Sequence, residues 1–211
     1  ISFLFFWRCN DYIMTDIIKR FKHELEKVQK LPTKPSLLLH TCCAMCFSSS
    51  FLQIKDYFQV TVYYFNPNIY PLEEYEKRKN EVLRLIDIFE KEYQVKIDFI
   101  EEKKDFNDYL QCKIHQKGCQ DCLHLRLLYS FQYAMQHHYD YVTTTLTLGR
   151  LKDSSLINSL AYSLQPMFPT VHYLYSDFKK NKGIDLSLQC KEKYSIYAQC
   201  YCGCEKYDKK D

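Results

Sequence analysis

Short apolar runs alternate with longer amphipathic stretches along most of the chain, from Ser36 onward. This alternation predicts an α/β fold with a parallel sheet flanked by helices. The predicted strands are the apolar runs at residues 37–40, 60–65, 95–100, 141–144 and 171–173. The predicted helices are the amphipathic stretches at residues 48–58, 72–93, 123–138, 154–164 and 184–198. Ahead of the first strand, the segment TDIIKRFKHELEKVQ has the pattern of one more amphipathic helix.

The length of 211 residues suits one well-packed domain rather than two. We therefore expect an N-terminal extension and helix over residues 1–35, then a single α/β domain over residues 36–211 with a cysteine-rich C-terminal tail. No apolar run approaches the roughly 20 residues that span a bilayer. The apolar residues 1–7 are followed at once by Arg8 and by no small-residue cleavage site. These features predict a cytoplasmic protein with no membrane association.

Cysteine is unusually frequent, with 11 in the chain. A disulfide framework is the ordinary explanation for such a count in a small secreted protein. Here the number is odd, no export signal precedes it, and the cysteines cluster. The clusters lie at positions 42, 43 and 46, at 119 and 122, and at 200, 202 and 204. Thiols this close together suit a metal or a redox couple better than long-range crosslinks.

The segment LLLHTCCAMC is the strongest local signal, because it places Cys42, Cys43 and Cys46 directly after a buried strand. One buried thiol acts as a small hydrophobic residue, but three adjacent ones cannot all do so. In GCQDC, Cys119 and Cys122 have the spacing that lets two thiolates bind one metal or cluster. Ligands of open α/β sheets collect at the carboxyl ends of the strands, near a topological switch point. Both groups of thiols could meet there.

The C-terminal segment QCYCGCEKY carries Cys200, Cys202 and Cys204 at alternate positions. A C-x-C pair forms a small, strained disulfide ring, and strained exposed disulfides have the oxidising potentials of labile or catalytic couples. Gly203 gives the backbone the freedom to close such a ring. The competing interpretation is a frayed tail with idle thiols.

Other polar groups have both a ligand-binding and an ordinary structural interpretation. Asn66 and Asn68 in FNPNIYP either hydrogen-bond a ligand or form a plain turn. Asp177 in YSDFKK is either a metal ligand or a helix cap. The basic runs at residues 77–79 and 179–182 could contact phosphates, although charged runs are usually solvated faces. A net charge of +3 gives only a weak overall field.

Six motifs together resemble one family, the QueH-type epoxyqueuosine reductases. In chain order these are LLLHTCCAMC, FNPNIYPLEEYEKR, CQDCLHLRL, YVTTTLTL, YSDFKK and YCGC, and they run from about Ser36 to Tyr207. Each motif alone is weak evidence, whereas the combination is specific. Two positions depart from the family pattern: Met45 stands where proline is usual, and Cys200 adds a thiol to the tail.

The resemblance implies a Rossmann-like fold of the adenine nucleotide alpha hydrolase (HUP-like) type. It implies an enzyme that reduces epoxyqueuosine to queuosine at the wobble position of tRNA, the final step of queuosine biosynthesis. The partners would be tRNA carrying epoxyqueuosine in its anticodon loop and an external electron donor. The domain over residues 36–211 would then be catalytic.

The resemblance also assigns the cysteines. A [4Fe-4S] cluster would be bound by Cys42, Cys43, Cys119 and Cys122. The catalytic redox pair would be Cys202 and Cys204. A further mononuclear iron would lie beside the cluster, with Cys46 and Asp177 as its candidate ligands.

One alternative interpretation is a protein that binds a metal but does not catalyse the reduction. Cys112 and His115 lie just upstream of the C-x-x-C pair, and the four residues could form a local Cys₃His zinc site. That site needs neither Cys42 nor Cys43. It would make the protein a zinc-stabilised RNA-binding module without redox activity.

Overall fold

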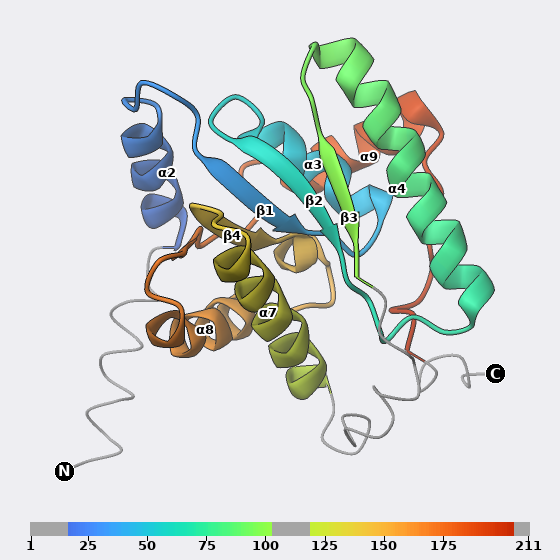
Figure 1. Ribbon diagram of the computed structural model, residues 1–211. Coiled ribbons are helices and arrows are strands. Elements are labelled where there is room, and N and C mark those ends of the chain that lie inside the picture. The colour runs from blue at the N-terminus through green and yellow to red at the C-terminus, as the bar shows by residue number, and fades with distance from the viewer. Residues whose placement is uncertain (1–16, 103–118, 205–211) are drawn as a thin grey trace.

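The computed structural model describes residues 17–102 and 119–204. Five strands form one sheet in the order β3-β2-β1-β4-β5, and every pairing between neighbours is parallel (Figure 1). The strands are β1 (Ser36–His40), β2 (Gln59–Tyr64), β3 (Asp98–Glu101), β4 (Tyr141–Thr144) and β5 (His172–Tyr173). The chain runs outward from β1 to β3 and then returns to β4 on the other side of β1. The switch point of the sheet therefore lies between β1 and β4.

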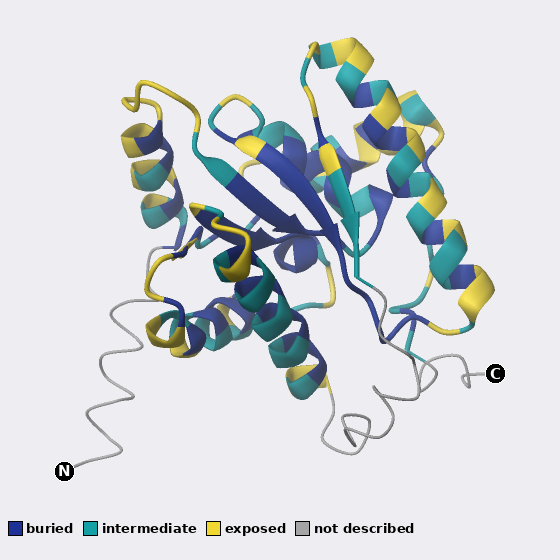
Figure 2. Cartoon of the chain, in the orientation of Figure 1, coloured by how far each residue is buried: buried dark blue, intermediate teal, exposed yellow. Residues whose placement is uncertain are grey.

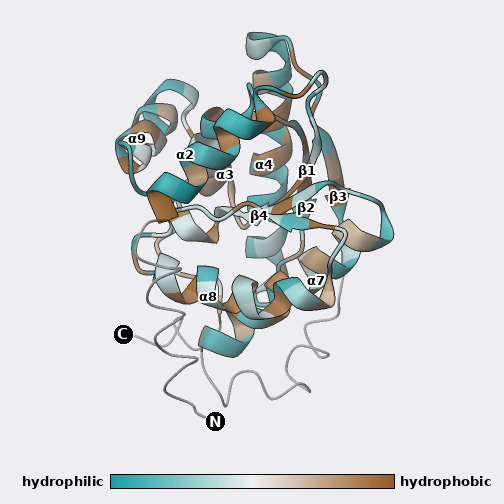
Figure 3. Ribbon diagram, turned by 90° about the vertical axis from the view of Figure 1, so that its left-hand side faces the viewer, coloured by the Kyte–Doolittle hydropathy of each residue, from teal (hydrophilic) through white to brown (hydrophobic). Residues whose placement is uncertain are grey.

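Helices cover both faces of the sheet, as the sequence predicts. They are α2 (Ile17–Val28), α3 (Ala44–Ile54), α4 (Leu72–Tyr93), α7 (Cys119–Gln136), α8 (Ser154–Leu164) and α9 (Gly183–Tyr194). Short 3₁₀ helices, η1 (Thr145–Leu148) and η2 (Gln165–Met167), follow β4 and α8. In Figure 3, α7 and α8 lie on one side of the sheet and α2, α3 and α9 on the other. None of the described helices combines the length and apolar character of a bilayer-crossing segment.

The strand β1 is apolar throughout because both its faces are covered. Leu37 and Leu39 pack against α2, α3, α4 and α9, whereas Leu38 packs against α7 and α8. Figure 2 shows β1 and β2 buried along most of their length, with exposed residues on the outer faces of the helices. The two cores leave the carboxyl ends of the strands as the edge at which side chains can reach a ligand.

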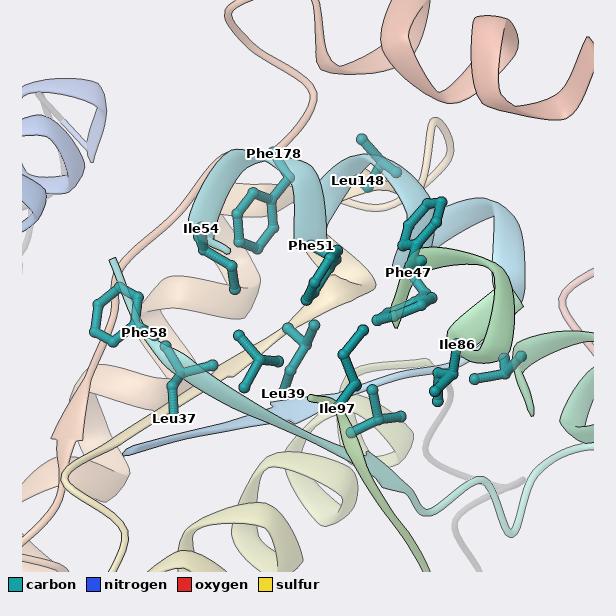
Figure 4. Close-up of a cluster of buried hydrophobic side chains, with 14 of the residues drawn as sticks. Leu37, Leu39, Phe47, Phe51, Ile54, Phe58, Ile86, Ile97, Leu148 and Phe178 are labelled. Atoms are coloured by element: carbon teal, nitrogen blue, oxygen red, sulfur yellow. The ribbon is translucent and has the colours of Figure 1, made fainter. Parts of the chain in front are cut away.

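An aromatic group anchors α3 to the sheet (Figure 4). The ring of Phe51 stacks on Phe89 of α4 with centroids 5.5 Å apart, and Phe47 lies 5.3 Å from Phe51. Both α3 rings are at most 1% exposed. Since α3 begins directly after Cys43, this packing fixes the helix whose N-terminus carries the first group of cysteines.

Phe51→Ala is expected to lower the free energy of unfolding by about 3–5 kcal/mol, because it leaves a cavity in a close-packed core. The shift of the urea midpoint at unchanged slope measures this loss. Leu72→Ala is the control, since Leu72 is 67% exposed, and it should change stability by no more than about 0.5 kcal/mol. Equal effects of the two substitutions would contradict the assigned core.

The helices α3, α7 and α9 each differ from the predicted limits at both ends, whereas α4 and α8 match them. α3 begins at Ala44 rather than at residue 48, and α9 ends at Tyr194 rather than at residue 198. α7 begins at Cys119 rather than at residue 123, so Cys119 and Cys122 lie within its first turn instead of preceding it. Cys46 likewise lies within the first turn of α3.

Candidate metal centre

The first two thiols lie at the carboxyl edge of the sheet, at its switch point. β1 ends at His40, and Thr41 continues the ladder by donating its N–H to the Tyr63 carbonyl over 2.9 Å. Cys43 is the N-cap of α3 with extended backbone, φ −171° and ψ 164°, and its side chain makes no capping hydrogen bond. The Cys42 N–H donates to Thr145 Oγ1, just beyond β4, over 3.4 Å. The motif thus bridges the ends of β1 and β4.

Three sulfur atoms form a compact group, which we call the thiol triad. The Sγ atoms of Cys42, Cys43 and Cys46 all lie within 4.8 Å of one another, and those of Cys42 and Cys43 are 3.9 Å apart. Cys43 is buried, and the other two are half-buried. This is the spacing of donors that share one metal or cluster, and it confirms that the first motif can form a metal site.

The triad shares protons unequally. The pKa of Cys42 is held well below its usual range, because Cys43 and Cys46 hydrogen-bond to its sulfur and Arg126 adds positive charge. Cys43 and Cys46 donate these hydrogen bonds, so the same interaction holds their protons and raises the pKa of each. Cys42 is therefore the thiol of the triad that most readily gives up its proton to bind a metal. Binding through the other two sulfurs requires their protons to leave, so metal binding and proton release are coupled.

Two buried arginines balance the negative charge of the triad. Arg126 of α7 and Arg78 of α4 are each 2% exposed, and the charge of each interacts with the Cys42 thiolate. Arg78 also pairs with Glu74 at 2.6 Å, and Arg126 Nε donates to the Cys122 carbonyl over 3.3 Å. A buried anion needs such partners to offset its loss of hydration. The arginines thus favour thiolates at this position.

His40 positions the strand ends and is not free to bind a metal. Its Nε2 lies 3.0 Å from the Phe65 carbonyl and its Nδ1 lies 2.8 Å from Thr144 Oγ1. Burial lowers the pKa of His40 to about 4, which keeps the ring neutral at pH 7. A carbonyl can only accept, so Nε2 carries the proton and Nδ1 accepts from the Thr144 hydroxyl. Both ring nitrogens are used in tying β1, β2 and β4 together.

The C-terminal tail docks onto the same edge of the sheet. The Tyr70 N–H donates to the Gly203 carbonyl over 2.7 Å, and the Arg78 guanidinium donates to the carbonyls of Tyr201 and Cys202, each over 3.2 Å. Gly203 has φ +98°, and a Cβ there would approach Ile69 Cγ1 to 3.0 Å. A glycine is required both for this backbone conformation and for this close contact.

The tail also contacts the triad and one more cation. The side chain of Gln199 hydrogen-bonds the Cys43 thiol. Lys152 Nζ donates to Cys202 Sγ over 3.3 Å. Cys202 and Cys204 are both half-buried, and Cys200 is exposed. Through Gln199 and Arg78, the predicted redox pair is held beside the predicted metal ligands.

The structure brings three of the predicted metal ligands together, and it does not place the others in the same group. Cys46 joins Cys42 and Cys43, whereas Cys119, exposed, and Cys122, buried, are not part of this group. One turn after Cys122, however, Arg126 acts on the Cys42 thiolate. Asp177 accepts the Lys179 N–H at 3.3 Å, which fits a turn cap. Of the alternative zinc site, Cys112 and His115 lie outside the described residues.

Sequence reasoning missed the cations of the site. Arg126 lies in the motif CQDCLHLRL, but only the cysteines of that motif were assigned a role, and Lys152 lies in none of the motifs. Arg78 lies in a run interpreted as a solvated or phosphate-binding face. The side chains of residues 77–79 instead contact other groups of the same chain. Lys77 lies 3.7 Å from the ring centre of Tyr197, and Lys79 pairs with Glu76 at 2.6 Å and Glu101 at 3.3 Å. The helical spacing of Glu74 and Arg78, four residues apart, was the available signal for an inward-facing ion pair.

Comparisons with known proteins agree with this geometry. In structure, the chain is similar to the U34-tRNA thiolase NcsA from Methanococcus maripaludis, which was solved with its [4Fe-4S] cluster. The TM-score is 0.52 at 12% identity, over 87% of this chain and 66% of that chain, slightly under two thirds of it. At this identity the likeness shows the Rossmann-like fold alone.

Sequence relatives are more specific. The chain is 31% identical over 204 residues to the epoxyqueuosine reductase QueH of Staphylococcus epidermidis, covering 92% of this chain and 82% of the relative. It is 33% identical over 193 residues to that of Streptococcus pyogenes, covering 88% and 75%. A family model described as epoxyqueuosine reductase QueH matches residues 37–211. With the thiol triad at its expected place, the chain belongs to the QueH family of epoxyqueuosine reductases.

Proposed function

We propose that this chain reduces epoxyqueuosine to queuosine in tRNA, with an iron–sulfur cluster that takes Cys42 and Cys43 of the thiol triad among its ligands. The observation that carries the proposal is the triad itself, three sulfurs within 4.8 Å at the switch point of the sheet in a member of the QueH family. The docked tail supports it, because a second pair of thiols, Cys202 and Cys204, lies at the same edge.

The donor set fits a [4Fe-4S] cluster. Cysteine thiolates are the usual ligands of such clusters, and the lowered pKa of Cys42 supplies one without an external base. In the proposed ligand set, Cys42 and Cys43 act with Cys119 and Cys122, and Cys46 is left for a further iron. When bound, the cluster supplies single electrons and an iron centre that polarises the departing oxygen.

The tail thiols can supply the electrons and protons that the reduction consumes. Converting an epoxide to an alkene breaks two carbon–oxygen bonds, consumes two electrons and two protons, and releases the oxygen as water. Cys202 and Cys204 can provide both electrons and both protons by forming one disulfide. An external dithiol reductant then restores the pair. Lys152, which donates to Cys202 Sγ, and Arg78, which holds the backbone of the tail, keep this pair oriented.

The decisive test is turnover by protein purified without oxygen. The reductase should contain iron and acid-labile sulfide, and should convert epoxyqueuosine in tRNA to queuosine, as nucleoside mass spectrometry of digested tRNA would record. The zinc-stabilised RNA-binding module predicts a colourless protein that contains zinc and gives no product. Zinc in place of iron, together with no conversion, would refute the proposed function.

Binding of tRNA should weaken with salt, because phosphate contacts release bound counterions. A few contacts to a single-stranded loop predict a fall in affinity on the order of ten-fold between about 50 and 200 mM salt. Filter binding or fluorescence anisotropy at several salt concentrations measures the slope. An affinity independent of salt would argue against tRNA as the partner, whatever the metal content.

A further inference from the structure

Two buried asparagines in the loop between β2 and α4 have unpaired acceptors. Asn66 and Asn68 are each 1% exposed. The side-chain carbonyl oxygen of each has no hydrogen-bond donor within the described part of the chain. The same is true of the side-chain oxygen of Gln199 in the tail. Buried acceptors are almost always paired, so an unpaired one calls for a functional explanation.

These acceptors belong to the two segments that flank the thiol triad. Asn66 Nδ2 donates to the carbonyl of Thr41, the residue before Cys42, over 2.8 Å. The far end of the same loop holds the tail, because Tyr70 donates its N–H to the Gly203 carbonyl. Gln199 contacts the Cys43 thiol directly. The loop thus joins the triad on one side to the tail cysteines on the other.

A third buried asparagine, on a helix away from the thiol triad, has its side-chain hydrogen bonds made within the protein. Asn158 of α8 is completely buried. Its Nδ2 donates to the carbonyls of Ser154 and Ser176 over 2.7 and 2.9 Å, and its oxygen accepts the Ser176 N–H over 3.2 Å. Asn158 thus differs from the two loop asparagines, whose oxygens have no donor within the described residues.

The chemistry of an amide oxygen restricts what can pair with it. It accepts hydrogen bonds and cannot donate them. Cluster sulfides, thiolates and phosphate oxygens are acceptors too, so none of them can form a hydrogen bond with these atoms. A partner that does so must carry N–H or O–H groups, as the base and the hydroxyls of a nucleoside do.

We infer that Asn66 and Asn68 recognise the modified nucleoside of the substrate by accepting hydrogen bonds from its N–H and hydroxyl groups. The inference rests on the proposed function and deepens it, because it names the residues that select the substrate. A buried polar site built to pair with substrate donors strongly rejects an analogue without them, since its own groups are then left unpaired. The asparagines would therefore distinguish modified from unmodified tRNA.

The test compares two tRNAs that differ only at the wobble position, one with epoxyqueuosine and one with guanosine. The wild-type protein with its metal should bind the first more tightly. Asn68→Ala should reduce this preference by roughly ten-fold or more, on the scale of one lost polar contact, and should leave binding of the guanosine tRNA unchanged. Asn68→Leu, which keeps side-chain volume without an acceptor, should behave in the same way.

Two further measurements separate recognition from folding and from metal binding. Neither Asn68 variant should lower the melting temperature as far as Asn158→Ala does, because the Asn68 oxygen that each removes has no donor within the described residues. Asn158→Ala is the matched control: it should lower the melting temperature, since it loses three hydrogen bonds, and it should keep the preference for modified tRNA. The iron content of both Asn68 variants should equal that of the wild type.

Three results would overturn the inference. A preference that survives in both Asn68 variants would show that the residue does not recognise the nucleoside. Loss of iron in these variants would make the oxygen a metal ligand instead. A wild-type protein that binds both tRNAs equally and gives no product would refute the proposed function, and the inference with it. The first two results concern the Asn68 variants alone, so they would refute the inference and leave the proposed function standing.

Discussion

Cys42→Ser protein purified without oxygen is expected to contain little iron and to be inactive. Cys42 is the triad thiolate whose pKa is lowered by its neighbours, and a serine hydroxyl at pH 7 offers no equivalent anion. Losing a direct ligand should cost more than the roughly 10–100-fold that changes to the surroundings of a metal site cost. Iron and acid-labile sulfide per chain, together with conversion of epoxyqueuosine tRNA, measure the loss.

The matched control for this substitution is Cys190→Ser. Cys190 is 4% exposed and lies on the inward face of α9, in the hydrophobic core and outside the triad. Its serine variant should keep its iron and its activity, with only a small loss of stability. A full complement of iron in Cys42→Ser would rule out the triad as the metal centre.

The same assay decides which thiols complete the site. Under the proposed ligand set, Cys122→Ser should lose the cluster, whereas Cys46→Ser should keep it and lose at most the further iron. If the triad alone supplied three cluster ligands, the outcome would be reversed. The structure groups Cys46 with Cys42 and Cys43, so this comparison tests the assignment directly.

The elements with strong periodicity could be predicted from the sequence. The predicted limits of β4, α4 and α8 coincide with those in the structure, because each has a clear change from one hydrophobic period to another at its ends. The start of α3 could not be predicted in the same way. Its first turn is part of the cysteine motif, and no side chain marks the N-cap at Cys43 with a hydrogen bond.

The candidate site was predictable where its residues are adjacent in the chain. Cys42, Cys43 and Cys46 lie within one turn of a strand–helix junction, so their convergence follows from local geometry. Arg78 and Arg126 come from separate helices, and only the order of the strands brings them to the same thiolate. A sequence without known contacts cannot distinguish such an arginine from a solvated one.

The loop asparagines show a different limit. In the sequence, Asn66 and Asn68 fit a turn as well as a ligand site, because asparagine is common in both. Their burial and their unpaired oxygens distinguish these interpretations, and neither property can be read from residue type. Under the proposals above, the edge of the sheet is a site with separate parts for metal, electrons and substrate.

The tail thiols should be needed for turnover but not for the metal. Cys202→Ser and Cys204→Ser are each expected to keep iron and sulfide at the wild-type level, because neither belongs to the proposed ligand set. With a dithiol reductant, each should fall to below roughly one hundredth of the wild-type rate, the scale expected for a residue that takes part in proton and electron transfer. With either cysteine replaced, the Cys202–Cys204 disulfide that releases two electrons cannot form.

Cys200→Ser is the control within the same tail. Cys200 is exposed, whereas Cys202 accepts a hydrogen bond from Lys152, so the Cys200 variant should keep its rate with the dithiol reductant. A strong low-potential reductant that does not exchange with thiols should restore product formation in Cys202→Ser, since it delivers electrons without the pair. If Cys202→Ser turned over normally with the dithiol, the electrons would have to enter by another route, and the tail would serve only to cover the site.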